Sequence, residues 1–169
     1  MRTRFRWTGF VLAMMVVAAE LPGQQVPVPK NGSNADRLIS GGATANVAGY
    51  PDIGLITLSE MCRTIREVFD ASQLPVIVDA DTGYSEGEGV IRTAVDYERA
   101  GAAGLHIEDQ VFPKRCGHLD GKELIPAEDM AEKIAAMAQH RLSKDFIIIA
   151  RTDARHVTGM KDAIARANL

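Results

Sequence analysis

Short apolar runs alternate with helical segments over most of this chain, and this alternation restricts its fold more than any other feature. Four of the runs are expected to be buried strands, over residues 37–40, 75–80, 104–108 and 146–150. Helical periodicity follows each run, beginning near residues 57, 89, 126 and 159. A repeated strand–helix pattern is typical of a parallel sheet covered by helices, so the sequence predicts the α/β class.

Local signals define the ends of these helices. Thr57 and Glu60 have the spacing of a capping box, which predicts a helix that begins directly after Thr57. Gly101 is placed to end the second helix in a left-handed turn. Pro126 suits the first turn of the third helix, whose methionines Met130 and Met137 are expected to fill the core.

A polar group stands at the carboxyl end of every predicted strand. Loops are often acidic, so one such group could be an ordinary solvated residue. Four successive strands that end in this way favour an active site instead, because parallel α/β folds place their sites at this edge. The groups are Ser40-Gly41-Gly42, Asp79 with Asp81, Glu108 with Asp109, and Arg151 with Asp153.

The carboxylates of Asp79, Asp81 and Glu108 have the chemistry of a site for a hard cation. Residues i and i+2 of a strand point the same way, so the two aspartates could share one ion with Glu108 of the next strand. Oxygen ligands favour Mg²⁺, or Mn²⁺, over zinc. The alternative is that one aspartate only caps the turn at Thr82-Gly83.

The segment Lys-Arg-Cys-Gly-His, residues 114–118, carries the most chemical information. A thiol flanked by two cations and an imidazole should form a thiolate readily and exchange protons, and Gly117 would keep this loop mobile. The alternative is a basic surface loop in which Cys116 is incidental. His106 lies within a strand and is expected to be a core residue or a neighbour of the site rather than a ligand.

Composition favours small-molecule chemistry. A net charge of −3 gives no broad basic surface for nucleic acid. The two cysteines, Cys62 and Cys116, are too few for a disulfide scaffold and lack a zinc-site spacing, which favours a reducing compartment. A hydrophobic content of 46% over 169 residues is enough for one globular domain.

Residues 1–35 differ in character from the remainder and are expected to be a separate N-terminal extension. Arginines precede an apolar stretch over residues 9–19, as in a secretory signal, but that stretch is too short for a membrane-spanning helix. The alternative is a misannotated or rearranged N-terminus. We expect no membrane association and a cytoplasmic location.

From Leu38 to the end, the chain resembles the isocitrate lyase and phosphoenolpyruvate mutase superfamily. The resemblance rests on LISGGATANVAGYPDIGLITLSEM, VDADTGY, AGAAGLHIEDQVFPKRCGH and IIIARTDA, in the family's order and spacing. It implies a TIM-type (β/α)8 barrel, usually a tetramer, that binds Mg²⁺ together with a 2-oxo acid or its enolate.

The resemblance also implies roles for individual residues. Arg151 would stabilise charge on the substrate oxygen, and Cys116, with His118 beside it, would exchange a proton with the carbanion fragment. Asp52 would line the site. The metal ligands would be Asp79, Asp81 and Glu108, and the substrate-binding residues Ser40, Gly41, Gly42, Gly117 and Arg151.

The KRCGH segment resembles the lyase branches, and the short connection from SGG to PDIG resembles those that act on methylisocitrate or dimethylmalate. The expected reaction is retro-aldol cleavage to pyruvate and a dicarboxylate, with the exact substrate open. The alternative within the superfamily is a carboxyvinyl-carboxyphosphonate phosphorylmutase-like enzyme.

Residues 36–169 hold about half of the eight strands of such a barrel. The expected fold is therefore a partial TIM-type barrel, which makes the tetramer doubtful for this chain. It leaves two further hypotheses open: a catalytically silent fragment, or a chain that pairs with another subunit.

Overall fold

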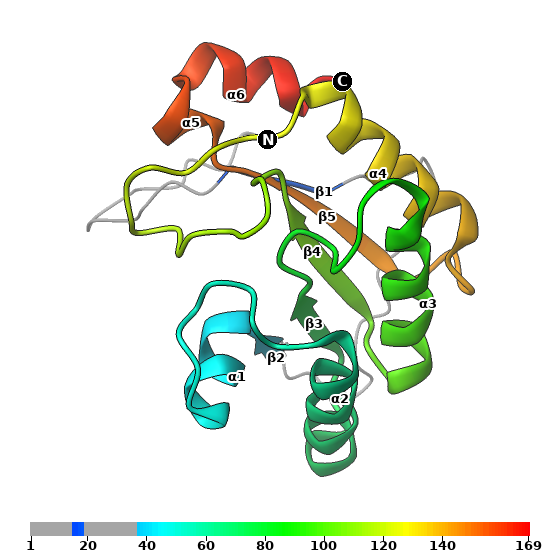
Figure 1. Cartoon of the computed structure of the whole chain (residues 1–169). Coiled ribbons are helices and arrows are strands. Elements are labelled where there is room, and N and C mark those ends of the chain that lie inside the picture. Colours follow the sequence, from blue (N-terminus) through cyan, green and yellow to red (C-terminus); the bar gives the residue numbers. More distant parts are fainter. Residues whose placement is uncertain (1–14, 19–36) are drawn as a thin grey trace, which may run out of the picture.

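The computed structural model describes residues 15–18 and 37–169, which form a five-stranded sheet with helices packed beside it (Figure 1). The order of strands across the sheet is β1-β5-β4-β3-β2. Their bounds are β1 Met15–Ala18, β2 Arg37–Ile39, β3 Val76–Asp79, β4 Gly104–Glu108 and β5 Ile147–Thr152.

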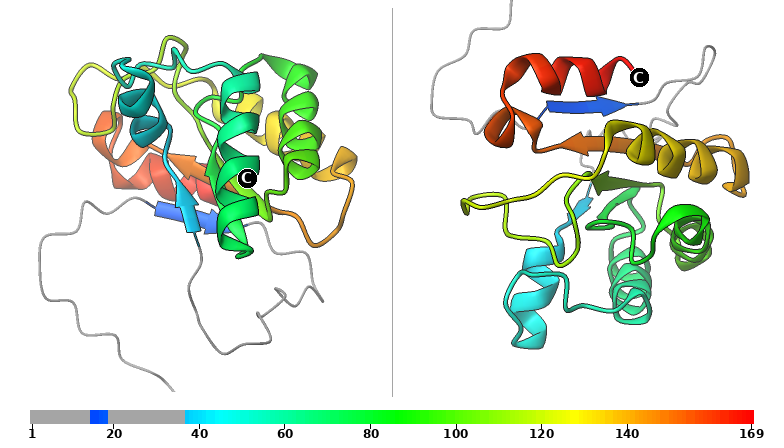
Figure 2. Two further views of the ribbon diagram at one scale, coloured as in Figure 1. Left: turned by 90° about the horizontal axis from the view of Figure 1, so that it is seen from below. Right: turned by 45° about the horizontal axis from the view of Figure 1, so that its top comes forward.

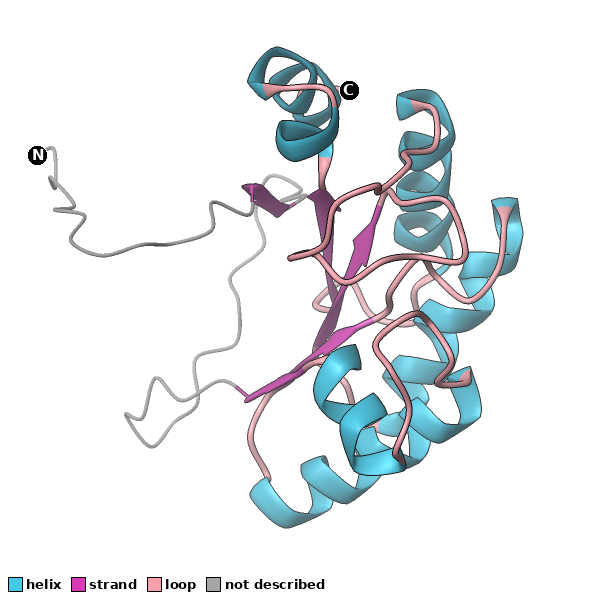
Figure 3. Cartoon of the chain, turned by 60° about the vertical axis from the view of Figure 1, so that its left-hand side comes forward, coloured by secondary structure: helices cyan, strands magenta, loops and turns pink. Residues whose placement is uncertain are grey.

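Most of the helices lie on one side of the sheet (Figure 3). Helices α2, α3 and α4 pack successively against one another along that side. The helices are α1 Gly41–Ala48, α2 Leu58–Ser72, α3 Val90–Ala100, α4 Ala127–His140, α5 Ala154–Val157 and α6 Met160–Ala167, with a short 3-10 helix η1 at Gly87–Gly89.

The four strands predicted from the sequence are present within two residues of their expected ends, and β2, β3, β4 and β5 pair in parallel in chain order. This confirms the α/β class. In the register of the strands, Asp79 pairs with His106, and Glu108 pairs with Arg151. The parallel pairing therefore gathers the polar strand ends at one edge of the sheet. The partial TIM-type barrel stays a prediction.

The strand β1 lies within the N-terminal apolar stretch, whose signal-like character stays a prediction. Met15–Ala18, expected to be part of a signal-like segment, pairs antiparallel with β5 (Figure 2). The remainder of the predicted signal segment, residues 1–14 and 19–36, lies outside the described residues. In the part of the chain that is described, no helix has the length and apolarity needed to cross a membrane.

The predicted helix ends are largely confirmed. Thr57 and Glu60 make both hydrogen bonds of the capping box at the start of α2. Gly101 ends α3 with φ 104°, in the left-handed region. Pro126 is the N-cap of α4 rather than a first-turn residue, because its ψ of 146° is extended. Helices α1 and α5 were not predicted.

The core lies between the sheet and the helices. Met61 of α2, Tyr97 of α3 and Met137 of α4 are completely buried there, so methionine is core filler as predicted. Between β4 and β5 the backbones approach closely, since a Cβ at Gly104 would lie 2.7 Å from the carbonyl oxygen of Ile147. Only glycine allows this approach without a shift of the backbone.

Tyr97 connects this core to the end of β3. Its hydroxyl donates a hydrogen bond to the backbone oxygen of Asp79 at 2.9 Å and lies 3.1 Å from the hydroxyl of Tyr84. We expect Tyr97→Phe to lower the free energy of unfolding by about 1–2 kcal/mol, because a buried acceptor loses its partner. Urea denaturation measures this change. The exposed Tyr50→Phe serves as control, and an equal loss in both variants would contradict the assignment.

Candidate active site

The two aspartates at the end of β3 are held by a tight turn. Asp79 is the last residue of the strand, whereas Asp81 has φ 47°, in the left-handed region that non-glycine residues seldom adopt. Asp79 Oδ1 accepts a hydrogen bond from the Asp81 amide at 2.9 Å, and the Asp81 carbonyl accepts one from the Glu108 amide at 2.8 Å. The turn, rather than strand alternation as predicted, therefore sets the direction of Asp81.

Gly41 and Gly42, predicted to offer amides to a substrate carboxylate, begin helix α1 and lie against the aspartates. The Gly41 amide donates to Asp79 Oδ2 at 3.1 Å. A Cβ at Gly41 would lie 3.0 Å from Asp81 Oδ1, and one at Gly42 would lie 3.1 Å from Asp52 Oδ2. The glycines thus leave space for three carboxylates, and Ser40, directly before them, is exposed.

Lys114 joins Asp52 to Asp81. Its ammonium nitrogen lies 2.5 Å from Asp52 Oδ1 and 2.8 Å from Asp81 Oδ1, although the latter pair does not have the direction of a hydrogen bond. Burial opposes the charge on Lys114, but Asp81 and Asp52 outweigh that effect and raise its pKa. Asp52 therefore lies at the site, as predicted, through a contact with a residue 62 positions away.

Glu108 and Arg151 form the second buried ion pair of the site. The guanidinium NH1 lies 2.9 Å from Glu108 Oε2, as expected from their direct pairing across β4 and β5. Burial raises the pKa of Glu108 to about 8, and Arg151 acts in the opposite direction. Burial, followed by repulsion from Asp79, also raises the pKa of Asp81.

Two other residues at this edge have supporting positions. Asp109 accepts hydrogen bonds from the Thr152 hydroxyl at 2.6 Å and from the Asp153 amide at 3.0 Å, so it joins the ends of β4 and β5. His106 Nδ1 lies 3.5 Å from Asp79 Oδ1, beside the site as predicted. Burial lowers the pKa of His106, which favours the neutral imidazole.

The donor set fits a hard divalent cation in its chemistry. Asp79, Asp81 and Glu108 are buried, and the raised pKa values of the last two reflect the cost of placing several carboxylates away from water. Oxygen ligands of this kind suit Mg²⁺. Within residues 37–169, however, no three acidic, histidine or cysteine side chains are close enough to enclose an ion directly. Water would have to complete the coordination.

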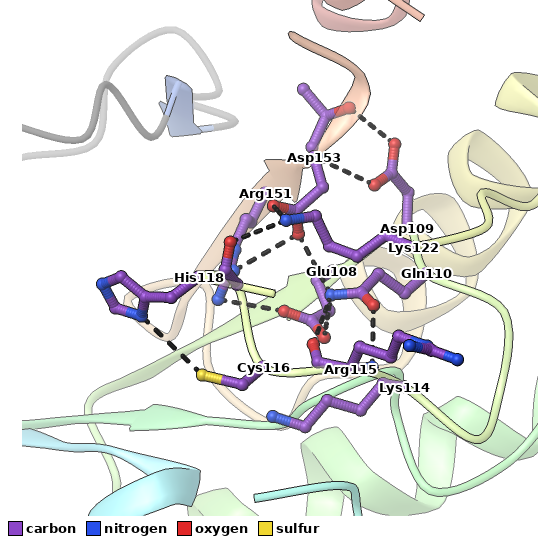
Figure 4. A network of polar contacts seen from close by, with 12 residues as sticks. Glu108, Asp109, Gln110, Lys114, Arg115, Cys116, His118, Lys122, Arg151 and Asp153 are labelled. Carbon is purple, nitrogen blue, oxygen red and sulfur yellow. Dashed lines mark hydrogen bonds and ion pairs between the residues drawn. The ribbon is translucent and has the colours of Figure 1, made fainter. Parts of the chain in front are cut away.

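The Cys116 segment lies on a loop that leaves the sheet after β4 and returns before α4. Residues 110 and 124 pair in an antiparallel bridge that closes the base of this loop. The half-buried Cys116 places its sulfur 3.7 Å from Nδ1 of the exposed His118. Figure 4 shows the two side chains joined by this contact. The imidazole is therefore near the thiol as predicted.

The two neighbouring cations have other partners. Lys114 binds Asp52 and Asp81, and Arg115 NH1 donates to the carbonyl of Asp120 at 3.3 Å. The prediction that both cations would flank the thiol came from adjacency in the sequence. In the structure, oxygen atoms of other residues engage both cations.

Gly117 brings the loop against Arg151. A Cβ at Gly117 would lie 2.7 Å from the guanidinium NH2, so only glycine permits this contact without movement. Cys116 and Arg151, 35 positions apart in the chain, therefore lie in one region at the carboxyl ends of β4 and β5 (Figure 4).

Sequence reasoning missed two residues of this region, Gln110 and Lys122, and the contacts of a third, Lys114. Gln110 and Lys122 are buried polar residues that bind the Cys116 loop, and Lys114 connects the aspartates. The sequence held no local signal for any of these contacts, apart from the position of Gln110 two residues after a predicted strand end.

Comparisons with known proteins show which family the chain is similar to. The family model for phosphoenolpyruvate phosphomutase matches residues 35–169. A 2-methylisocitrate lyase from Aeropyrum pernix is 51% identical over 131 residues, which are 78% of this chain and 42% of that protein. The chain thus spans less than half of the length of that relative.

Solved structures of the same superfamily are similar to this chain. A crystal structure of 2,3-dimethylmalate lyase, described as a member of the PEP mutase/isocitrate lyase superfamily, has a TM-score of 0.72 and 40% identity over 78% of this chain and 45% of that one. Phosphonopyruvate hydrolase in complex with oxalate and Mg²⁺ has a TM-score of 0.71 and 29% identity over 79% of this chain and 46% of that one. The chain therefore belongs to the phosphoenolpyruvate mutase and isocitrate lyase superfamily.

Proposed function

We propose that this chain carries the catalytic edge of a magnesium-dependent carbon–carbon lyase. Its substrate would be a 2-hydroxy acid of the methylisocitrate or dimethylmalate type, cleaved to pyruvate and a second carboxylate. The observation that carries the proposal is the contact of the Cys116 loop with Arg151, beside a cluster of buried carboxylates. The lyase relatives support it.

The cleavage requires three events at defined atoms. The substrate hydroxyl loses its proton and becomes the carbonyl of the 2-oxo acid. The carbon–carbon bond next to it breaks, and its electron pair stays on the neighbouring carbon, which bears a carboxylate. That carbanion then takes up a proton. A site for this reaction needs a base, a cation for the developing oxygen charge and an acid.

The residues of this edge can fill these roles. Arg151 presents a partly buried guanidinium that can stabilise negative charge on the substrate oxygen. Asp52, on the facing loop, is our candidate for the base that accepts the hydroxyl proton. Cys116 is the candidate acid that protonates the carbanion, and His118 lies near enough to return a proton to the thiol afterwards.

Asp79, Asp81 and Glu108 are our candidates for holding Mg²⁺, partly through water. When bound, this ion supplies Lewis-acid polarisation of the substrate oxygens. Gly41 borders Asp79 and Asp81, and Gly42 borders Asp52. The small backbone at Ser40, Gly41 and Gly42 is therefore the proposed wall for the carboxylate of the oxo acid. The loop of Cys116, closed on Arg151, would exclude water from the carbanion.

Binding of Mg²⁺ with oxalate, a mimic of enolpyruvate, tests this site directly. At a hundred times Kd, a ligand adds about 2.7 kcal/mol of stability, which should raise Tm by about 5–10 °C in a chain of this size. We expect the increase in thermal unfolding followed by circular dichroism only when both ligands are present. Asp81→Asn is expected to abolish it. A cooperative transition whose Tm stays the same with both ligands present would contradict the metal and oxo-acid site.

Turnover is tested on the same protein with 2-methylisocitrate and 2,3-dimethylmalate in the presence of Mg²⁺. Pyruvate release, followed by coupling to lactate dehydrogenase and NADH, is the expected result. Oxalate binding without any pyruvate from either substrate would support the site but refute the proposed substrate class.

A further inference from the structure

We propose that Gln110, Lys122 and Asp153 form a latch that holds the Cys116 loop closed over Arg151, and that they are positioning residues for the thiol. The KRCGH motif by itself assigns no role to any of these three residues. This inference rests on the proposed function for its catalytic meaning, but its geometry is independent of the substrate. Figure 4 shows the three side chains between the loop and the end of β5.

Gln110 clamps the first half of the loop. This residue is 1% exposed, and its carboxamide bonds both backbone groups of Arg115: Oε1 accepts from the amide at 2.9 Å, and Nε2 donates to the carbonyl at 3.0 Å. The pair imitates a strand-to-strand contact and fixes the backbone directly before Cys116. Since Nε2 also donates to Glu108 Oε1 at 3.0 Å, the loop is tied to the carboxylate cluster.

Lys122 clamps the second half. Its ammonium donates to the carbonyl of Gly117 at 2.6 Å and to that of Leu119 at 3.1 Å, on the far side of Cys116. The side chain is 1% exposed. Burial of an ammonium costs free energy unless hydrogen bonds satisfy its protons. The position of Lys122 therefore indicates a role in holding the loop rather than in keeping it soluble.

Asp153 joins the two clamps. Its Oδ2 lies 3.2 Å from the Gln110 amide nitrogen, and its Oδ1 lies 3.8 Å from the Lys122 ammonium. The same Oδ2 accepts from Arg151 NH2 at 3.2 Å. One carboxylate at the end of β5 therefore holds both halves of the loop and the guanidinium on which Gly117 rests.

The arrangement explains how a glycine-containing loop can place a thiol accurately. Gly117 lets the backbone of the loop adopt more than one conformation. Its close approach to Arg151 persists only if other contacts hold the loop in the closed one. Charge-assisted hydrogen bonds are the strong ones in proteins, so the Lys122 clamp should dominate the closed state. Loss of that clamp should make the loop open more often and expose Cys116.

Alkylation of Cys116 measures this opening without any need for turnover. In a Cys62→Ala background, Cys116 is the only thiol of the chain, because the sequence holds two cysteines. We expect Lys122→Met to increase the rate of N-ethylmaleimide modification about tenfold, the effect of losing one charged hydrogen bond. Lys144→Met, the same substitution at an exposed lysine, should leave the rate unchanged.

A second readout separates loop opening from a change in thiol chemistry. Trypsin can cut after the exposed Arg115 only when the loop leaves the sheet edge, so cleavage there should also accelerate in Lys122→Met. Gln110→Leu provides an independent variant, for which we expect the same two changes. Both assays are run well below the Tm of each variant.

The outcomes decide between a latch and other roles. Faster alkylation together with faster cleavage after Arg115 supports the latch, whether or not the chain releases pyruvate. Faster alkylation alone means that Lys122 tunes the thiol and overturns the latch. Rates within twofold of the Lys144→Met control in both assays overturn it as well. A failure of the proposed lyase function would appear only in the oxalate and pyruvate experiments.

Discussion

Replacement of Cys116 with serine should lower the rate of carbon–carbon cleavage by about a hundredfold to ten-thousandfold. The hydroxyl is a far weaker acid than the thiol and cannot supply a proton to the carbanion at neutral pH, and general acids contribute rate factors of this size. The half-buried thiol packs against His118 rather than the core, so the serine should fit without a loss of stability. The measurement is kcat for pyruvate release.

Binding serves as the companion measurement for this variant. The increase in Tm with Mg²⁺ and oxalate should persist in Cys116→Ser, because the thiol is not among the candidate ligands. Cys62→Ala is the matched control, since Cys62 is the buried thiol of α2 and burial raises its pKa. Cleavage at the rate of the unchanged chain in Cys116→Ser would remove the thiol from the mechanism.

Arg151→Gln should affect both stability and binding. Arg151 neutralises Glu108 and Asp153 in a buried environment, with pairs at 2.9 and 3.2 Å. Removing one member of a buried ion pair costs about 3–5 kcal/mol, because the partner stays buried without its counter-charge. We expect a loss of this order in urea denaturation and the disappearance of the Mg²⁺–oxalate shift.

Arg166→Gln separates the two effects. Arg166 is buried to the same extent and pairs with Asp109 at 3.2 Å and Asp162 at 3.0 Å, but it lies on α6 and outside the proposed substrate residues. It should lose comparable stability yet keep the oxalate response. If both variants lose the response equally, Arg151 acts through the fold and not on the ligand.

Local pattern was sufficient to predict much of the fold. The capping box at Thr57 and Glu60 and the left-handed Gly101 are short-range features, so the sequence alone predicts the ends that they set. The strand ends were also predictable, because an apolar run followed by Asp, Glu or Arg marks the point where a buried strand leaves the core.

Other elements depend on contacts that local pattern does not contain. Helix α1 begins with two glycines, whose intrinsic helix propensity is low. Their lack of a side chain leaves space for the neighbouring carboxylates, which helix propensity does not reflect. Strand β1 pairs with β5 across 131 to 137 positions, from Ala18 with Ile149 to Met15 with Thr152. The apolar residues of β1 do not by themselves distinguish a strand from a signal-like run.

The candidate site likewise combines residues that the sequence predicted with residues that only the fold brings together. Asp79, Asp81, Glu108 and Arg151 were predicted because each stands at a strand end. The partners of Lys114 and Lys122 were not, because a lysine in a loop reads as a solvated residue until the fold shows it buried. Residue type indicated the chemistry, and long-range packing decided which charges meet.

The left-handed backbone of Asp81 limits how this position can be varied, whatever its chemistry. At φ 47°, aspartate, asparagine and glycine fit with little cost, whereas longer side chains carry a steric penalty of about 1–2 kcal/mol. A Cβ at Gly41 would lie 3.0 Å from Asp81 Oδ1, so these two positions pack closely. Substitutions at this position are therefore limited by side-chain shape more than by charge. Asparagine removes the charge and keeps the shape, so it is the informative substitution. Glutamate keeps the charge but changes both the backbone and the packing.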